Sequence, residues 1–294
     1  MHRTFAILAA IMLTTLSVTT AGFAHITDGI RFSLQPGRTA DRVQLHLRTG
    51  KDDHNNGMSS SFALADLNGL DAARLRAAGL TPISFALVRE AGRIDCAGNA
   101  ARGRADGSCR FTDNPAFADL LAARGMRRPT IEQAYGLTIV GATRGLLDAL
   151  HANRYPMPTV DDYTAMSAVG VTPSYIQQLS AAGYRPADSK RLIEYAAIGV
   201  TPEYLGSLAR AGYANLPQDE VVQLAALKID PEFIRGFERI GYRNLPVETL
   251  VQLKALDVTP EFVRSLEGQG IKAPPAEQLV KLRAIGFVPK SRRR

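Results

Sequence analysis

The sequence contains no tryptophan, two cysteines and five histidines among its 294 residues. Its histidines form no His-Glu-x-x-His pair, and the chain has neither a Gly-x-Ser-x-Gly elbow nor a Walker phosphate-binding loop. These absences argue against the commonest zinc peptidases, serine hydrolases and P-loop nucleotide hydrolases. We therefore expect a protein that is not an enzyme and has no cofactor; a hydrolase with an unrecognised site ranks last among the functions considered.

Long hydrophobic runs are also scarce. One extends from Phe5 to about Val18, after a short basic opening and before the small-x-small ending Gly22-Phe23-Ala24. This arrangement, with a run too short for a comfortable membrane span, predicts a cleavable export signal over residues 1–24, cleaved after Ala24. An uncleaved anchor is the alternative. The predicted location is periplasmic or secreted, and the composition, rich in alanine and arginine, favours the bacterial periplasm.

The two cysteines, Cys96 and Cys109, fall on the two arms of a predicted hairpin. In an oxidising compartment such a pair most simply forms a disulfide, which closes a loop of roughly 14 residues and stabilises by about 3 kcal/mol in the chain-entropy model. Metal-binding or nucleophilic roles are weaker alternatives, because there is no Cys-x-x-Cys spacing and no nearby histidine.

The second half of the chain repeats with a period of 29 residues. The repeated prolines are Pro173, Pro202, Pro231, Pro260 and Pro289, and the repeated glycines are Gly183, Gly212, Gly241 and Gly270. A fixed period of this length indicates stacked supersecondary units, each too small to bury its apolar face alone. The repeat can be followed back to Asn114, so we expect a helical repeat domain over residues 114–294.

Each unit is predicted to hold two short helices. In the unit that starts at Pro202, Thr201 can cap the first helix, and proline suits its first position. Gly212 ends that helix in the left-handed conformation, and Tyr213 after it packs back onto the helix in a Schellman motif. A second amphipathic helix follows, as in the segment opened by Pro246.

Residues 25–113 instead contain short alternating runs, typical of half-buried strands. We expect strands around Ile30–Leu34, Val43–Leu47 and Ile83–Leu87, a polar loop over 51–57, and a short helix within 66–79. A hairpin should follow, with arms at 92–98 and 107–112 and a long Gly/Arg/Asp-rich connection. The predicted fold class is therefore α+β: a small N-terminal antiparallel β domain followed by an α-solenoid-like array of two-helix repeats.

Two metal sites deserve consideration. Asp52, Asp53 and His54 could ligate a metal, although a charged hairpin loop is usually only solvated. Cleavage after Ala24 would leave His25 at the N-terminus, where its amine and imidazole could bind copper, with His46 or His54 completing the site. A frayed terminus is the simpler interpretation, and we expect no metal.

The formal net charge is +7, and removal of the signal leaves +6, because Arg3 goes with it. A mild positive balance favours acidic partners or anionic envelope surfaces. Against this, the charges are expected to be spread over solvated helix faces, apart from the basic tail at 290–294, which is either a surface-binding patch or a frayed end. The repeated Tyr184, Tyr213 and Tyr242 could form a stacking ladder, but their position after the helix-ending glycines favours packing.

The repeated motif resembles a repeat region of bacterial envelope proteins. It consists of Gly-Val-Thr-Pro-Glu-(Tyr/Phe), then Gly-Tyr, then Asn-Leu-Pro and an apolar helix. It is similar to the region after the membrane metallopeptidase in some BlaR-type sensor proteins, and the segments 61–70 and 88–92 resemble the part that precedes those repeats. The region has no assigned activity. The peptidase part is absent here, so the resemblance implies no protease function.

We therefore predict an exported, non-enzymatic interaction module whose helical-repeat surface binds another envelope protein or peptide. Envelope sensing or regulation is a role that such a module could serve. The binding residues cannot be located from the sequence. The alternative is an accessory sensor that binds a small ligand or envelope polymer between the β domain and the repeats. We expect no nucleic-acid partner, and no integral membrane protein once the signal is cleaved.

Overall fold

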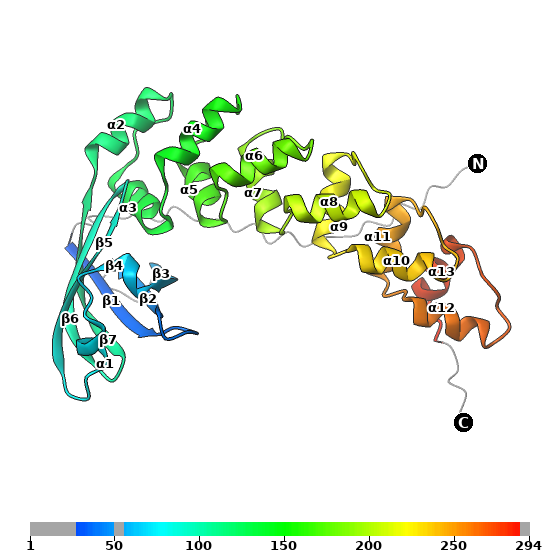
Figure 1. Cartoon of the computed structure of the whole chain (residues 1–294), viewed down its shortest axis with the longest axis horizontal. Helices are drawn as coiled ribbons and strands as arrows, with labels where there is room; N and C mark the ends of the chain where they lie inside the picture. The colour runs from blue at the N-terminus through cyan, green and yellow to red at the C-terminus, as the bar shows by residue number, and fades with distance from the viewer. Residues whose placement is uncertain (1–27, 50–55, 289–294) are drawn as a thin grey trace.

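The computed structural model describes residues 28–49 and 56–288. It contains a curled, seven-stranded antiparallel sheet followed by an extended array of helices (Figure 1). The predicted α+β fold class is therefore confirmed. The predicted signal segment, His25, the cluster Asp52-Asp53-His54 and the basic tail lie outside the described residues.

Strands that are neighbours in the sheet are also consecutive in the sequence, with one exception. Its strand order is β3-β2-β1-β7-β6-β5-β4, so the first and last strands of the domain pair at its centre. The strands are β1 (Asp28–Pro36), β2 (Arg42–Thr49), β3 (Asn56–Ala63), β4 (Leu67–Asn68), β5 (Thr81–Arg89), β6 (Gly92–Ala101) and β7 (Arg104–Asp113). A 3-10 turn (Leu64–Asp66) precedes β4, and the short helix α1 (Ala72–Arg76) precedes β5.

One face of the sheet forms a hydrophobic core, because inward and outward residues alternate along each strand. Phe32 of β1 and Phe85 of β5 meet edge to face in this core, with ring centroids 5.1 Å apart. Leu75 of α1 packs against the same face. The opposite face of the sheet carries polar side chains and faces solvent.

Two expectations for this domain are wrong. The predicted loop over 51–57 ends earlier, since β3 begins at Asn56. The long connection predicted within the hairpin is also absent: β6 and β7 continue to a turn at Arg102 and Gly103. The polar residues there alternate with inward-facing Ala100 and Ala105, which are 1% and 5% exposed, so the segment is strand in spite of its loop-like composition.

The helices of the array form two series, each starting at 29-residue intervals. The first helices of the units are α2 (Pro115–Ala123), α4 (Arg144–Ala152), α6 (Pro173–Ala181), α8 (Pro202–Arg210), α10 (Pro231–Glu238) and α12 (Pro260–Glu267). The second helices are α3 (Ile131–Val140), α5 (Val160–Ala168), α7 (Ser189–Ala197), α9 (Gln218–Ala226), α11 (Val247–Ala255) and α13 (Ala276–Ala284). The period seen in the sequence is thus the period of the structure.

The ends of the first helices follow from local chemistry. The Thr201 hydroxyl accepts a hydrogen bond from the backbone N–H of Tyr204, and Pro202 is the first helical residue. Gly212 has φ +89°, and the N–H of Tyr213 donates to the carbonyl of Leu208 at 3.0 Å, as in a Schellman motif. The glycines at 183, 241 and 270 also have a positive φ.

The second helices begin differently. Pro246 precedes α11 and has an extended conformation, so it is not the first helical residue. The helix therefore starts without a side-chain cap, and the loop before it turns at Asn244, which has φ +52°. Asparagine is one of the few residues that tolerate this left-handed conformation.

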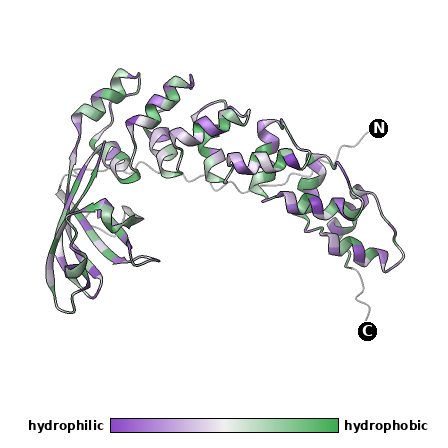
Figure 2. Ribbon diagram, viewed as in Figure 1, coloured by the Kyte–Doolittle hydropathy of each residue, from purple (hydrophilic) through white to green (hydrophobic). Residues whose placement is uncertain are grey.

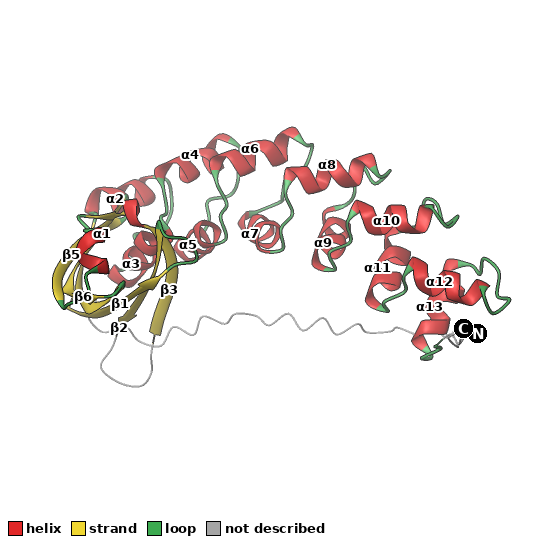
Figure 3. Cartoon of the chain, turned by 60° about the horizontal axis from the view of Figure 1, so that its bottom comes forward, coloured by secondary structure: helices red, strands yellow, loops and turns green. Residues whose placement is uncertain are grey.

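The two helix series form two parallel rows along a curved array (Figure 3). Figure 2 shows short helices that each mix hydrophilic and hydrophobic residues, in keeping with a core that lies between the rows. None of the helices in 28–49 and 56–288 is both long enough and apolar enough to cross a membrane.

The sheet contacts the array mainly through α3. Ala134, Tyr135 and Ile139 belong to the hydrophobic core of the sheet, and the rings of Tyr135 and Phe111 meet edge to face at 5.4 Å. The β domain thus covers the N-terminal end of the helical array, where an exposed apolar face would otherwise lie.

Candidate functional site

The charges of the array are separated by structural position. Residues 114–288 contain equal numbers of acidic and basic side chains, yet the helices hold fifteen acidic and nine basic ones. The loops that join the first to the second helix of each unit hold a single acidic residue, Asp188, and eight basic ones: Arg124, Arg127, Arg128, Arg154, Arg185, Arg239, Arg243 and Lys272. We call this set of loops the loop edge. Most of the charged residues lie on helices, as expected, but the excess of positive charge in these loops was not expected from the sequence.

Neighbouring loops of the loop edge contact each other directly. The Arg185 guanidinium donates to the carbonyl oxygens of Asn153 at 2.7 Å and Arg154 at 3.0 Å, both in the preceding loop. On the other side, the Gln218 side chain donates to the Arg185 carbonyl at 2.9 Å. These contacts span about one unit in sequence, so the loops form one continuous edge along the array.

Tyrosine hydroxyls make further bonds between loops. Tyr213 donates to the Leu245 carbonyl at 2.7 Å, and Tyr242 donates to the Pro274 carbonyl at 2.5 Å. Burial raises the pKa of both hydroxyls. Tyr184 accepts a hydrogen bond from the backbone N–H of Leu216 at 3.2 Å. Because these hydroxyls are occupied and their rings are half-buried, the structure favours packing over a stacking ladder for sugars or bases.

Only some of the basic side chains on the loop edge are neutralised. Arg124 forms an ion pair with Asp148 at 2.7 Å, and Arg128 pairs with Asp119. The other members, apart from Arg185, are exposed and form no ion pair with any residue in the described ranges; they are Arg127, Arg154, Arg239, Arg243 and Lys272. The edge therefore presents unpaired positive charge on an ordered backbone.

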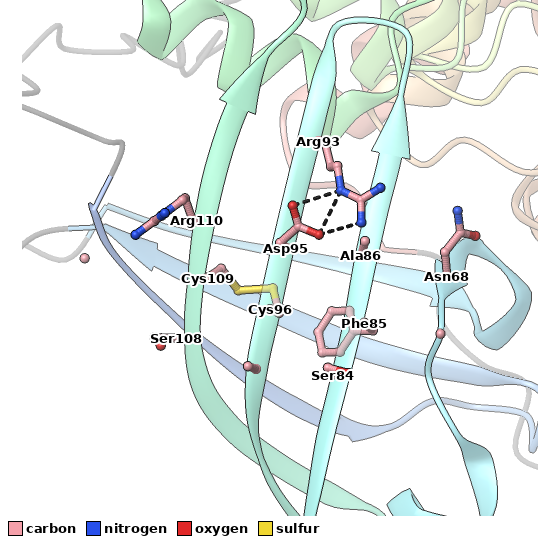
Figure 4. A pocket seen from close by; sticks show the side chains of 13 residues that line it. Asn68, Ser84, Phe85, Ala86, Arg93, Asp95, Cys96, Ser108, Cys109 and Arg110 are labelled. Carbon is pink, nitrogen blue, oxygen red and sulfur yellow. Dashed lines mark hydrogen bonds and ion pairs between the residues drawn. A yellow bond between two sulfur atoms is a disulfide. The ribbon is translucent and has the colours of Figure 1, made fainter.

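The solvent-facing side of the sheet contains a hollow of about 530 Å³ between β5, β6 and β7 (Figure 4). Two of its charged members, Arg93 and Asp95, lie side by side on β6, and the Arg93 Nε is 2.8 Å from both carboxylate oxygens. The hydrogen bond and charge of Asp95 raise the pKa of Arg93. The two groups satisfy each other, and nothing in this hollow resembles a nucleophile with its base.

The predicted disulfide is present. Cys96 on β6 and Cys109 on β7 are directly opposite each other in register, with Cα atoms 4.1 Å apart and sulfurs bonded. Both side chains face the sheet core, where they are 4% and 6% exposed. The bond therefore joins the two longest strands of the sheet covalently.

The histidines considered for metal binding are not brought together within the described ranges. His46 lies on β2, with Ser33 and Ser59 as its partners on the flanking strands, and His151 is exposed near the end of α4. His25 and His54 lie outside the described residues. Across 28–49 and 56–288, no group of three or more histidine, cysteine, aspartate or glutamate residues is arranged to hold a metal ion.

The contact between sheet and array, where the alternative hypothesis places a ligand, is packed with the side chains of Tyr135, Phe111 and their neighbours. The hollows found on the β domain are lined by residues of that domain alone. No family model matches the chain, and no curated protein or solved structure was found to be similar to it. The resemblance to the repeat region of BlaR-type sensors therefore stays a prediction.

Proposed function

We propose that this protein is an exported, non-enzymatic interaction module that binds an acidic protein or peptide of the cell envelope along its loop edge. The observation that carries the proposal is the row of exposed, unpaired basic side chains at Arg127, Arg154, Arg239, Arg243 and Lys272. Their positive charge recurs over most of the length of the array, which suits an extended partner better than a small molecule.

The loop edge is also rigid enough to act as a template. Its loops are joined by the Arg185 guanidinium and the Tyr213 and Tyr242 hydroxyls, so the backbone is ordered before a partner arrives. A surface that is already ordered loses less conformational entropy on binding. Because the charges are exposed, they should raise the association rate and make binding sensitive to salt.

Export is part of the same proposal. The predicted signal at residues 1–24 directs the chain to the periplasm or outside the cell, and the Cys96–Cys109 disulfide is compatible with an oxidising compartment. The positive edge then meets acidic envelope proteins or peptides. Envelope sensing or regulation is the broader role that this placement suggests.

The proposal can be tested with two triple variants that change the net charge equally. Arg127→Gln, Arg154→Gln and Arg243→Gln remove unpaired charges from the loop edge. Arg144→Gln, Arg235→Gln and Arg264→Gln remove three exposed charges from first helices instead. Each protein is exported with a photo-reactive residue at position 214, in the loop between α8 and α9 of the loop edge, and cross-linked in the periplasm.

One dominant cross-linked protein should appear with the wild type and the helix variant and be lost with the loop-edge variant. Equal loss of the cross-linked protein in both variants would mean that binding depends on the net charge of the chain and not on the loop edge. Equal retention in both would exclude the loop edge as the binding surface.

A second candidate function is an accessory sensor that binds a small ligand or envelope polymer. The observation that favours it is a cavity lined by arginines in the β domain, away from the contact with the array.

A further inference from the structure

One cavity of the β domain lies where three segments distant in sequence meet at one end of the sheet. These are the turn between β1 and β2, the C-terminal part of α1, and the turn between β6 and β7. The cavity has a volume of about 710 Å³, within the usual range for small-molecule sites. Four arginines line it: Arg38, Arg42, Arg76 and Arg102. We call it the arginine pocket.

Backbone hydrogen bonds join two of the three segments and close the third. The N–H groups of Arg102 and Gly103 donate to the carbonyls of Ala77 at 2.7 Å and Leu75 at 2.8 Å, which fixes the β6–β7 turn against α1. Across the β1–β2 turn, the N–H of Gly37 donates to the carbonyl of Arg42 at 3.0 Å. A Cβ atom at Gly37 would approach that carbonyl oxygen to 2.7 Å, so the tight turn requires glycine. The walls of the pocket are thus ordered without a ligand.

Two of the guanidinium groups are held in place by the protein. Arg42 donates to the Ser61 hydroxyl at 3.0 Å and to the Ser61 carbonyl at 2.7 Å. Arg76 donates to the Ala40 carbonyl at 2.9 Å. A guanidinium has five N–H donors, so Arg76 keeps donors for a ligand. The Arg42 guanidinium is held at Ser61 on β3, which does not line the pocket. Arg38 and Arg102 are exposed and form no ion pair within the described ranges.

The residues that line the arginine pocket include no acidic side chain. Asp41 is adjacent in sequence, and a hydrogen bond from Thr39 lowers its pKa, so it stays a carboxylate; it does not line the pocket. Asp71 is engaged with Arg74 at 3.4 Å. The positive charges of Arg38, Arg76 and Arg102 around one cavity repel each other, and an anion between them would relieve that repulsion.

The inner wall of the pocket is apolar. Leu75 is 3% exposed and Leu64 is half-buried, and both line the cavity with Pro36. Leu80, two residues beyond the lining residue Ala78, is 76% exposed. A ligand that fills this pocket therefore meets guanidinium groups at the rim and aliphatic side chains below.

We propose that the arginine pocket binds a phosphorylated ligand with an apolar portion, its phosphate held by Arg38, Arg76 and Arg102 and its apolar part on Leu64 and Leu75. A phosphate monoester fits better than a single carboxylate, because it carries more negative charge and more acceptor oxygens for the available donors. The site is independent of the loop edge and gives the β domain a binding role of its own. Either an anionic lipid headgroup or a soluble phosphorylated compound offers this chemistry.

The test uses the purified mature chain and two double variants of equal charge change. Arg38→Gln with Arg102→Gln removes the two unpaired charges of the pocket. Arg31→Gln with Arg48→Gln removes two exposed arginines that lie opposite each other on β1 and β2, away from the pocket. Dihexanoyl phosphatidic acid is titrated into each protein by calorimetry, with unchanged thermal melting as the check on folding.

The wild type should bind this probe at one saturable site. The pocket variant should bind about tenfold more weakly or worse, whereas the control variant should match the wild type, since charge-assisted bonds are lost only in the first. Absence of saturable binding, or equal weakening in both variants, would overturn the proposal.

Two further probes define the ligand. Glycerol phosphate lacks the apolar portion and should bind more weakly than the lipid analogue; equal affinity would overturn the role of Leu64 and Leu75. Sedimentation with phosphatidylcholine vesicles, with and without phosphatidic acid, distinguishes the sources. If the wild type binds the vesicles that contain phosphatidic acid and the pocket variant does not, the ligand is a lipid headgroup. If the wild type binds the free probe but not the vesicles, the ligand is a soluble compound. The loop-edge experiment is unaffected by either result.

Discussion

The hydroxyl of Tyr213 lies 2.7 Å from the carbonyl oxygen of Leu245, 32 residues further along the chain. The same relationship recurs one unit later between Tyr242 and Pro274. Each bond joins the loop of one unit to the loop of the next, where the half-buried carbonyl would otherwise lack a donor. Tyrosine at these positions therefore fixes the spacing of neighbouring units as well as the end of its own helix.

Replacing Tyr213 by phenylalanine should lower the free energy of unfolding by about 1 kcal/mol, because the Leu245 carbonyl loses its donor while the ring still packs. Urea denaturation followed by far-ultraviolet circular dichroism measures the change. The two-helix units share one array, so the loss should be seen in the main transition of the helices.

Tyr195 provides the matched control. Its hydroxyl is buried but has no hydrogen-bond partner within the described residues. Tyr195→Phe should therefore leave the free energy of unfolding unchanged or raise it, since it removes an unsatisfied polar group. If Tyr213→Phe is no more destabilising than Tyr195→Phe, the bonds between loops do not stabilise the array.

Gly241 tests the ends of the first helices. It has φ +96°, and a Cβ built at this position would meet no atom within 4 Å. Gly241→Val should still cost more than about 1 kcal/mol, because the strain of a β-branched residue at positive φ lies in the backbone itself. An unchanged melting curve would show that the helix end does not need the left-handed conformation.

The control for this substitution is a glycine inside a helix. Gly206 lies within α8, and its nearest neighbour to a new Cβ is the flexible end of Arg210 at 3.5 Å. Gly206→Ala should stabilise by about 0.5–1 kcal/mol, because alanine loses less conformational entropy in a helix. Opposite signs at Gly241 and Gly206 would separate backbone conformation from the loss of glycine as such.

The array could be predicted from sequence because its determinants are local. The backbone preferences of proline at Pro202 and of glycine at Gly212 act within one helix, and the 29-residue period repeats that information. The strand β3 escaped prediction because three consecutive serines obscure its alternation. Its pairing with β2 supplies the order that its own side chains do not.

The arginine pocket could not be predicted in the same way. Arg38, Arg76 and Arg102 are far apart in sequence, and only the sheet topology brings their turns and α1 to one end. The loop edge could have been predicted from the sequence, because the basic residues follow the ends of the first helices in most units. Comparing charges by position within the unit, rather than along the whole chain, would have revealed it.

Removal of the disulfide should destabilise the β domain. The bond between Cys96 and Cys109 closes a short loop, and the chain-entropy model gives about 3 kcal/mol for a loop of this size. The double variant Cys96→Ala with Cys109→Ala should lose about this much in urea denaturation. Wild-type protein with reductant should match the variant, and the untreated mature chain should be two hydrogens lighter by mass spectrometry. Two alkylatable thiols in the denatured, exported protein would refute the bond.

Alkaline pH should weaken the array through its buried tyrosines. Burial raises the pKa of Tyr163, Tyr175 and Tyr204 above the ordinary value, and raises the pKa of Tyr195 to about 12. In the unfolded chain these hydroxyls ionise near pH 10. The folded state therefore holds the protons more tightly, and this contribution to the free energy of unfolding is complete below about pH 10 and declines as the pH rises toward the folded pKa values.

Urea denaturation at a series of pH values between about 8 and 11, with tyrosinate absorbance of the folded protein as a second readout, measures this decline. Tyr204→Phe removes one of the groups whose pKa is raised, so its free energy of unfolding should fall less steeply above about pH 10 than that of the wild type. It should also be lower than the wild type at neutral pH, because the bond from the Tyr204 hydroxyl to the Ile229 carbonyl at 2.9 Å is lost. The two curves should therefore converge as the pH rises. Parallel curves, or folded protein in which these tyrosines are half ionised near pH 10, would mean that the hydroxyls are open to solvent and that the units are packed less closely than the structure shows.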